Sequence, residues 1–180
     1  AFDFFGVVRE FRYFGIDFAL IEKFNDDFKL NPMIRSSVDE FPSSIIDTFN
    51  INVPIPVGHH LCISGYASHT KCGDVTIADA RASLRPLRPG VQSDSFDHMI
   101  RAKIPSSNRD VGGAVFSNEY HNETIFTLVH GILTSTELER YSKAAGSVVI
   151  QPLRRIINFP LTRPIFENLR YIDLDTYRQL

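Results

Sequence analysis

The chain has 180 residues, of which 43% are apolar and 22% charged, so it is long enough to bury a core and too hydrophobic for a disordered segment. Nineteen Lys and Arg against twenty-one Asp and Glu give a formal charge of −2, which provides no electrostatic basis for binding nucleic acid or an anionic membrane. No stretch approaches the roughly 18 apolar residues of a membrane-spanning helix. We therefore expect one globular unit with no membrane span and no nucleic-acid partner.

The N-terminal part of the sequence predicts strands. Residues 4–14 alternate loosely between apolar and polar, and a compact apolar run follows at 18–21. The first five residues lack the basic start, apolar stretch and cleavage site of a signal peptide, so a secreted protein would be a processed form. Between Pro32 and Pro54 a Ser-rich sequence predicts a polar connection.

The rest of the chain contains short strand candidates separated by turns, and then a helix. The strand candidates lie at 61–64, 75–82, 98–103, 114–116, 125–133 and 147–150, with a turn-forming loop at 85–90. Strands at roughly ten-residue spacing favour a sandwich or a barrel. From Pro152 to Pro160 the period becomes helical, and the pattern at 165–174 is that of another short helix.

Few residues suggest a metal, cofactor or modification site. Cys62 and Cys72 are too few for a four-thiolate metal site, and on the residues alone they are either one disulfide or two unrelated buried thiols. His59 and His60, adjacent in a strand, point to opposite faces and cannot share a metal. No nucleotide fingerprint is present, so we expect no metal and no cofactor. The sequon at Asn122 follows a polar segment, 117–121, that predicts a turn able to present a glycan.

Four segments occur in an informative order along the chain. They are Gly15-Ile16-Asp17-Phe18-Ala19-Leu20-Ile21, then Cys62-Ile63-Ser64-Gly65 with Cys72-Gly73-Asp74-Val75, then Asn108-Arg109-Asp110-Val111-Gly112-Gly113-Ala114-Val115-Phe116, and finally Gln151-Pro152-Leu153. They resemble, respectively, the strand of the triad aspartate, the Cys-x-Ser-Gly and Cys-Gly-x-Val segments, the Gly-Asp-Ser-Gly-Gly-Pro-Val signature and the start of the C-terminal helix. These are features of the chymotrypsin-fold serine proteases, especially the bacterial streptogrisin and α-lytic type.

The resemblance implies a mainly β, trypsin-like double β-barrel, whose first barrel is incomplete in this chain, with a C-terminal helix and an added tail. It divides the chain into a remnant of the first barrel with the inter-barrel connection (1–57), the second barrel with its helix (58–160) and the tail (161–180). It also implies a disulfide between Cys62 and Cys72, which would place the protein in an oxidising, extracellular compartment.

The resemblance further implies that the catalytic residues are degenerate. Asp17 keeps the triad carboxylate, but Val111 occupies the position of the nucleophilic serine. Arg109 replaces a glycine that supplies an oxyanion-hole N–H, whereas the motif residues Asp110, Gly112 and Gly113 are kept. The triad histidine belongs upstream of Asp17, and none of the sixteen residues before Asp17 is His.

Other hydroxyls and imidazoles in the sequence are weak replacements for the missing serine nucleophile and triad histidine. Ser106 and Ser107 lie close to the motif, but a hydroxyl without a positioned base is a poor nucleophile. His98, His121 and His130 are expected to be histidines with satisfied or solvated nitrogens.

These features give three hypotheses. The first is a secreted, non-catalytic pseudoprotease that binds a protein partner or forms a homo-oligomer, for example as a toxin or effector subunit. The second is the C-terminal chain of a processed serine endopeptidase precursor, with the missing first-barrel segment on another chain. The third is an unrelated all-β domain with chance motif matches, which requires neither bonded cysteines nor a cleft at Val111.

Overall fold

The structure is a computed structural model that describes residues 6–12, 15–24, 27, 29, 31–38, 41–50, 53–84, 94–121, 124–137 and 146–160. Its strands are β1 (Gly6–Arg12), β2 (Phe18–Lys23), β3 (Met33–Val38), β4 (Phe41–Phe49), β5 (His60–Gly65), β6 (His69–Leu84), β7 (Asp94–Lys103), β8 (Ala114–His121), β9 (Thr124–Glu137) and β10 (Ser147–Pro152). The described helices are a 3₁₀ turn, η1 (Asn108–Asp110), and α1 (Leu153–Ile157). Among these residues, no helix has the length and apolar character needed to cross a membrane.

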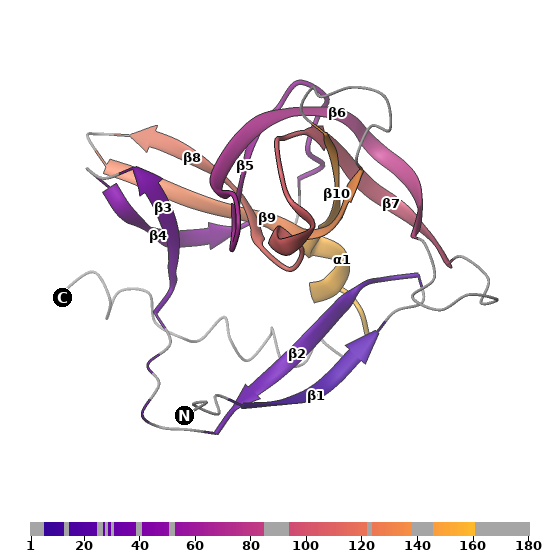
Figure 1. Ribbon diagram of the computed structural model, residues 1–180, viewed down its shortest axis with the longest axis horizontal. Coiled ribbons are helices and arrows are strands. Elements are labelled where there is room, and N and C mark those ends of the chain that lie inside the picture. The colour runs from indigo at the N-terminus through magenta and orange to yellow at the C-terminus, as the bar shows by residue number, and fades with distance from the viewer. Residues whose placement is uncertain are drawn as a thin grey trace.

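Six strands close into a barrel (Figure 1). They are hydrogen-bonded in the order β10-β7-β6-β5-β8-β9, and β9 also pairs with β10, which completes the ring. β4 adds to β9 in parallel, and β3 pairs with β4 in the antiparallel direction. β1 and β2 form a separate antiparallel hairpin. The prediction of a mainly β fold with a barrel and a C-terminal helix is therefore confirmed.

The barrel interior is filled by aliphatic side chains that alternate with outward-facing residues along each strand. On β5, Leu61 and Ile63 are fully buried in this core, whereas His60 on the same strand is exposed. The interior cluster consists of Ile55, Leu61, Ile63, Val75, Ile100, Ala102, Ile104, Val115, Leu133, Val148 and Ile150.

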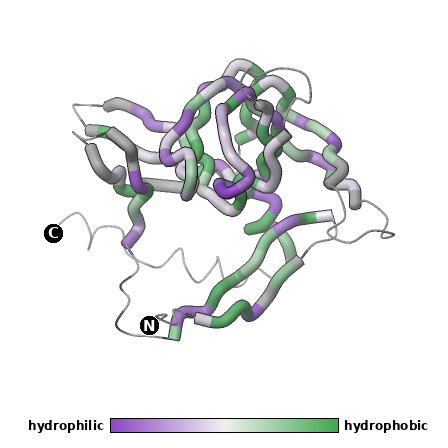
Figure 2. The backbone as a smooth tube through the Cα atoms, in the orientation of Figure 1, coloured by the Kyte–Doolittle hydropathy of each residue, from purple (hydrophilic) through white to green (hydrophobic). Residues whose placement is uncertain are grey.

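A second core lies outside the barrel and joins it to the hairpin and the helix. Phe18 of β2, Ile34 of β3 and Phe116 of β8 are buried in it together with Cys62. The helix α1 contributes the apolar stripe predicted from the sequence, Leu153, Ile156 and Ile157. This second core determines where the β1–β2 hairpin sits relative to the barrel; hydrophobic stretches run along both hairpin strands (Figure 2).

Two local sequence predictions are wrong. The segment between Pro32 and Pro54 is not simply a polar connection, because β3 and β4 occupy most of it. Its serines lie on strands that are anchored by apolar residues such as Ile34, and by pairing of β4 with β9. The segment 117–121 is strand rather than turn, since β8 pairs with β9 as far as His121. Asn122, the loop 85–90 and the helix expected at 165–174 lie outside the described residues.

Candidate functional site

The segment that resembles the catalytic-serine signature is held by Asp110. This carboxylate is 1% exposed and accepts backbone N–H bonds from Ala67 (2.7 Å) and Ser68 (2.9 Å) on one oxygen and from Ser107 (2.7 Å) on the other. Asp110 therefore connects η1 to the turn between β5 and β6. Burial raises its pKa, but the hydrogen bonds from Ser68, Ser107 and Ala67 outweigh that effect and lower the pKa to about 2. The group is ionised at neutral pH.

The glycines of the motifs are required by close contacts around Asp110. A Cβ added at Gly65 would lie 2.4 Å from Asp110 Oδ1, and one at Gly113 would lie 2.5 Å from the carbonyl oxygen of Ser64. Gly112 has a φ of +90°, a conformation that other residues adopt with strain. The Cys-x-Ser-Gly and Asp-Val-Gly-Gly segments are thus parts of one packed unit.

The retained loop presents a side chain without a nucleophilic atom. Val111 follows η1 directly and is 48% exposed, so it occupies an accessible position on the loop. The backbone N–H of Arg109 donates to Ser107 Oγ (3.3 Å) at the start of η1, where Ser107 and Asp110 also form a capping box. The N–H group that the resemblance assigns to the oxyanion hole at Arg109 is therefore already bonded within the loop.

Asp17 is tied to β10 through the side chain of Gln151. Its backbone N–H donates to Gln151 Oε1 (3.2 Å), and Gln151 is opposite Ile132 of β9. The next residue of β9, Leu133, exchanges backbone hydrogen bonds with Gly112 (2.8 Å) and Gly113 (2.9 Å). The nucleophile-like loop is thus bonded to β9 and Asp17 to the Gln151 side chain on β10; among the described residues no hydrogen bond joins Asp17 to the Val111 loop. Burial raises the pKa of Asp17.

A buried serine–histidine contact elsewhere on the barrel has the wrong proton arrangement for catalysis. Ser117 Oγ lies 2.7 Å from His130 Nε2, and Asn50 Nδ2 lies 3.1 Å from His130 Nδ1. Because Asn50 Oδ1 accepts from the Val53 N–H (3.1 Å), the amide presents its NH₂ to Nδ1. The imidazole proton is then on Nε2 and is donated to Ser117, whereas a general base must accept the serine proton there.

Electrostatics agree with a neutral, structural His130. Burial, aided by the neighbouring His59 ring at 5.6 Å, lowers the pKa of His130 to about 4.

A hollow of about 360 Å³ lies beside these two rings, and another of about 470 Å³ lies next to Ile16 and Arg154. Val111 is not among the described residues that line either hollow.

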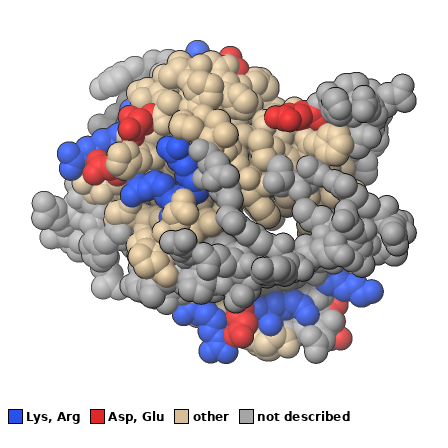
Figure 3. All heavy atoms as spheres, turned by 180° about the vertical axis from the view of Figure 1, so that it is seen from behind, with Lys and Arg blue, Asp and Glu red and all other residues tan. Residues whose placement is uncertain are grey.

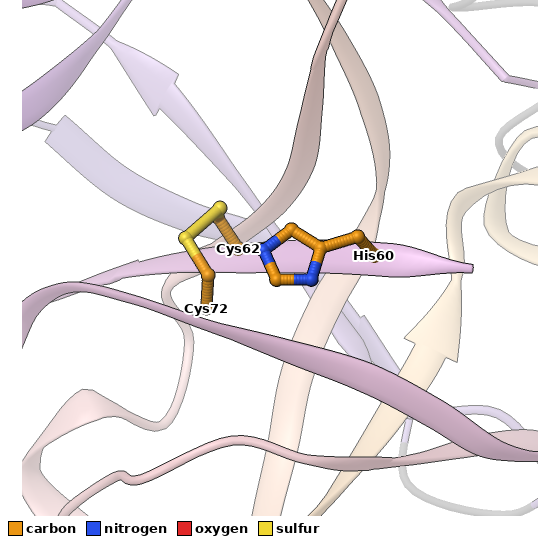
Figure 4. A group of neighbouring side chains, drawn as sticks. All are labelled: His60, Cys62 and Cys72. Atoms are coloured by element: carbon orange, nitrogen blue, oxygen red, sulfur yellow. A yellow bond between two sulfur atoms is a disulfide. The ribbon is translucent and has the colours of Figure 1, made fainter. Parts of the chain in front are cut away.

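The two cysteines form the predicted disulfide. Cys62 and Cys72 are directly opposite each other on β5 and β6, with an S–S distance of 2.01 Å. His60 lies beside them on the same face (Figure 4). Its Nδ1 is 2.8 Å from Asp74 Oδ1. His59 contacts His130 instead, so the two adjacent histidines do point to opposite faces.

Comparison with known proteins supports the fold. No protein-family model matches the chain, and no characterised protein matches it in sequence. Solved structures do match: the chymotrypsin of Cellulomonas bogoriensis has 16% identity and a TM-score of 0.63, over 84% of this chain and 70% of that one. Protease A of Thermobifida fusca has 13% identity and a TM-score of 0.62, over 84% and 69%. A glutamic-acid-specific serine protease, described as using a histidine triad in substrate binding, has 18% identity and a TM-score of 0.64, over 84% and 69%.

These structures share their fold with the chain, and the fold is that of chymotrypsin-like serine proteases. The shared fold and the disulfide are not required by the hypothesis of an unrelated all-β domain, whereas the position of Val111 outside both described hollows agrees with it. Identities of 13–18% carry no residue roles from those enzymes to this chain.

Proposed function

We propose that this chain is a serine-protease-like domain that does not catalyse acyl transfer and acts as a secreted binding or assembly module. The observation that carries the proposal is Val111, an exposed aliphatic side chain at the position that the resemblance assigns to the nucleophile, on a loop that keeps Asp110, Gly112 and Gly113. Acyl transfer in this fold needs a hydroxyl there, and valine has no atom that can attack a carbonyl carbon.

The distribution of kept and changed residues supports this proposal. Asp110 and the glycines around it are required by packing, as the contacts of Gly65 and Gly113 with their neighbours indicate. Val111 and Arg109 are the positions where chemistry rather than packing would require a particular residue. Loss at these two positions with retention of the others is the pattern expected when a scaffold is used without its reaction. The disulfide supports the extracellular location that we propose for it.

The decisive experiment is active-site labelling of the full chain with a fluorophosphonate probe, combined with a broad peptide-substrate panel. We expect neither labelling nor turnover, with a bacterial chymotrypsin-like protease as the positive control. A Val111→Ser variant distinguishes inactivity caused by the missing hydroxyl alone from inactivity caused also by the missing base and oxyanion-hole donor. It should also stay unlabelled, because the Arg109 N–H is bonded to Ser107 and Val111→Ser alone supplies no positioned base. Labelling of the unmodified chain, at Ser106 or Ser107 for example, would overturn the proposal.

The partner that we propose is a protein or a second copy of the chain, and the outer face of the β1–β2 hairpin is its contact surface. One hairpin face, with Phe18, is buried against the second core. On the other face Val8 lies opposite Ile21 and is followed by Phe11, and all three side chains are more than half exposed. An exposed apolar strand face of this kind is typical of interaction sites.

The same surface supports a second candidate function, the C-terminal chain of a processed serine endopeptidase whose first-barrel segment is on another chain. The chain covers only about 70% of the Cellulomonas bogoriensis chymotrypsin, which leaves room for such a segment. This candidate predicts fluorophosphonate labelling of a complex isolated from the native source. Labelling would have to occur on a residue other than Val111, which distinguishes it from the first proposal.

A further inference from the structure

Four side chains with metal-binding chemistry share one face of the β5–β6 ribbon. In the antiparallel register, His60 is opposite Asp74 and Cys62 is opposite Cys72. Because side chains two residues apart on a strand point to the same side, these two neighbouring pairs form a square patch. Lys71, between Thr70 and Cys72, belongs to the opposite face, so its positive charge is directed away from the patch.

The donor atoms of three of these residues converge. A ring nitrogen of His60 and the two sulfur atoms all lie within 4.8 Å of one another, and the ring is directed toward the disulfide (Figure 4). His60 Nδ1 is already bonded to Asp74 Oδ1 at 2.8 Å, which leaves Nε2 as the nitrogen available to a metal. A carboxylate that holds the far nitrogen of a histidine is the usual second partner of a zinc-binding imidazole, where it fixes the ring orientation and tautomer.

We propose that the reduced form of this patch binds Zn²⁺ through Cys62 Sγ, Cys72 Sγ and His60 Nε2, with Asp74 orienting the imidazole. Two thiolates and one imidazole form a known zinc ligand set, in which the fourth position is open to water. Tetrahedral zinc requires the two sulfurs to be about 3.8 Å apart, given Zn–S bonds of about 2.3 Å. Side-chain rotation at the two cysteines supplies that separation once the 2.01 Å S–S bond is broken.

Conversion of the disulfide-bonded form into the zinc-bound form balances in electrons and protons. A dithiol reductant supplies two electrons and two protons, so the Cys62–Cys72 disulfide becomes two thiols while the dithiol becomes a disulfide. Zinc binding then releases the two thiol protons to water. The same two strands would thus be joined by a covalent bond in oxidising surroundings and by a metal in reducing ones.

The surroundings of the patch fit this role. Cys62 is buried in the second core, which would shield one side of the ion, whereas Cys72 and His60 are exposed and leave a path for zinc from solvent. The sequence excludes a four-thiolate site, because it has two cysteines, and a shared His59–His60 site, because the two side chains point to opposite faces. A mixed set drawn from two paired strands becomes apparent only from the β5–β6 register.

The test uses the full chain, reduced with a phosphine and titrated with Zn²⁺ alone in competition with a chromophoric chelator. We expect one zinc per reduced chain and none per oxidised chain, and a thiolate-to-metal charge-transfer band when Co²⁺ replaces Zn²⁺. Asp74→Asn should weaken zinc binding by about 10–100-fold, the range for loss of a carboxylate behind a ligating histidine. His60→Ala should weaken it further.

The matched control is His98→Ala. His98 on β7 also pairs with a carboxylate, Asp79 on β6, at 3.0 Å, but Asp79 lies seven residues along β6 from Cys72, and His98 is not in the group of converging donor atoms. This variant should bind zinc like the unmodified chain. Equal zinc affinity of the His60→Ala variant and the unmodified chain would overturn the proposal, because it would indicate binding by the thiols of an unfolded chain. Zinc binding that does not depend on reduction would overturn it as well.

Discussion

At the scale of single residues, Asp110 is the group on which the loop depends. Its carboxylate is surrounded by backbone N–H donors from Ala67, Ser68 and Ser107. Asp110→Asn would point an NH₂ group at one of these donors and leave a buried N–H without an acceptor. We expect the free energy of unfolding to fall by about 1–3 kcal/mol, measured by urea denaturation. The exposed Asp97 is the control, since Asp97→Asn should change stability by no more than about 0.5 kcal/mol.

The pH dependence of stability gives a second measurement on Asp110. Its pKa of about 2 in the folded chain lies below the ordinary value of 3.8, so the unfolded chain binds the proton first on acidification. The stabilisation from this carboxylate is therefore complete above about pH 4 and is lost as the pH falls toward 2. Asp110→Asn should flatten the stability curve in that window. Parallel curves for the variant and the unmodified chain would contradict the role assigned to Asp110.

His130 gives a prediction at the same scale, about the direction of a proton. Its folded pKa of about 4 is below the ordinary 6.5, so acidification from pH 6.5 to 4 protonates the unfolded chain first and lowers stability. Nitrogen NMR should show the Nε2–H tautomer and no titration of His130 until about pH 4. Asn50→Asp should reverse the tautomer and raise the His130 pKa, because a carboxylate accepts from Nδ1. An Nδ1–H tautomer of His130 in the unmodified chain would contradict this prediction, because Nε2 would then be able to accept the Ser117 proton.

At the scale of elements, the β3–β4 ribbon packs one of its faces on the second core, which the serine-rich sequence does not indicate. Ile34 is 5% exposed in the second core, whereas Ile45, on the partner strand, is 57% exposed. Ile34→Ala should therefore lower the free energy of unfolding by about 2–5 kcal/mol, the cost of a buried cavity. Ile45→Ala should cost about 0.5 kcal/mol or less. Similar small effects of both substitutions in urea denaturation would contradict packing of this ribbon on the barrel.

Prediction from sequence succeeded for elements with strong local patterns. The barrel strands carry short apolar runs, as in β5 and β10, or apolar residues that alternate with polar ones, as in β6, and α1 carries an apolar stripe followed by Pro160, so local periodicity was sufficient there. It failed for β3 and β4, which are rich in serine and depend on a parallel pairing with β9, a partner about eighty residues away in the chain. The contact of Asn50 with His130 and the convergence of His60 on the cysteines are likewise products of tertiary structure, with no local signal in the sequence.

At the scale of the whole molecule, a closed barrel is joined to an open hairpin. The barrel ring leaves few unpaired edges among its six strands, but β1 and β2 form a two-stranded sheet, and such sheets are only marginally stable without packing. One face of the hairpin has that packing through Phe18. Seen from behind, basic and acidic side chains lie close together along the lower edge of the molecule (Figure 3). On the hairpin itself, Arg9 of β1 pairs with Glu22 of β2. Mixed charge beside exposed apolar residues favours a protein partner over a polyanion.

The proposed contact surface predicts association through the hairpin. Phe11 is 69% exposed on the outer hairpin face, so Phe11→Ser removes apolar area from the surface without opening the core. We expect light scattering after size exclusion to show concentration-dependent self-association of the unmodified chain, and a clear shift toward monomer for this variant. Tyr66→Ser is the matched control, because Tyr66 is 82% exposed in the β5–β6 turn, outside the hairpin, and its loss should leave association unchanged. An unmodified chain that is monomeric at every concentration would exclude a second copy as the partner. Equal effects of the two variants on association would show that the hairpin is not the contact surface.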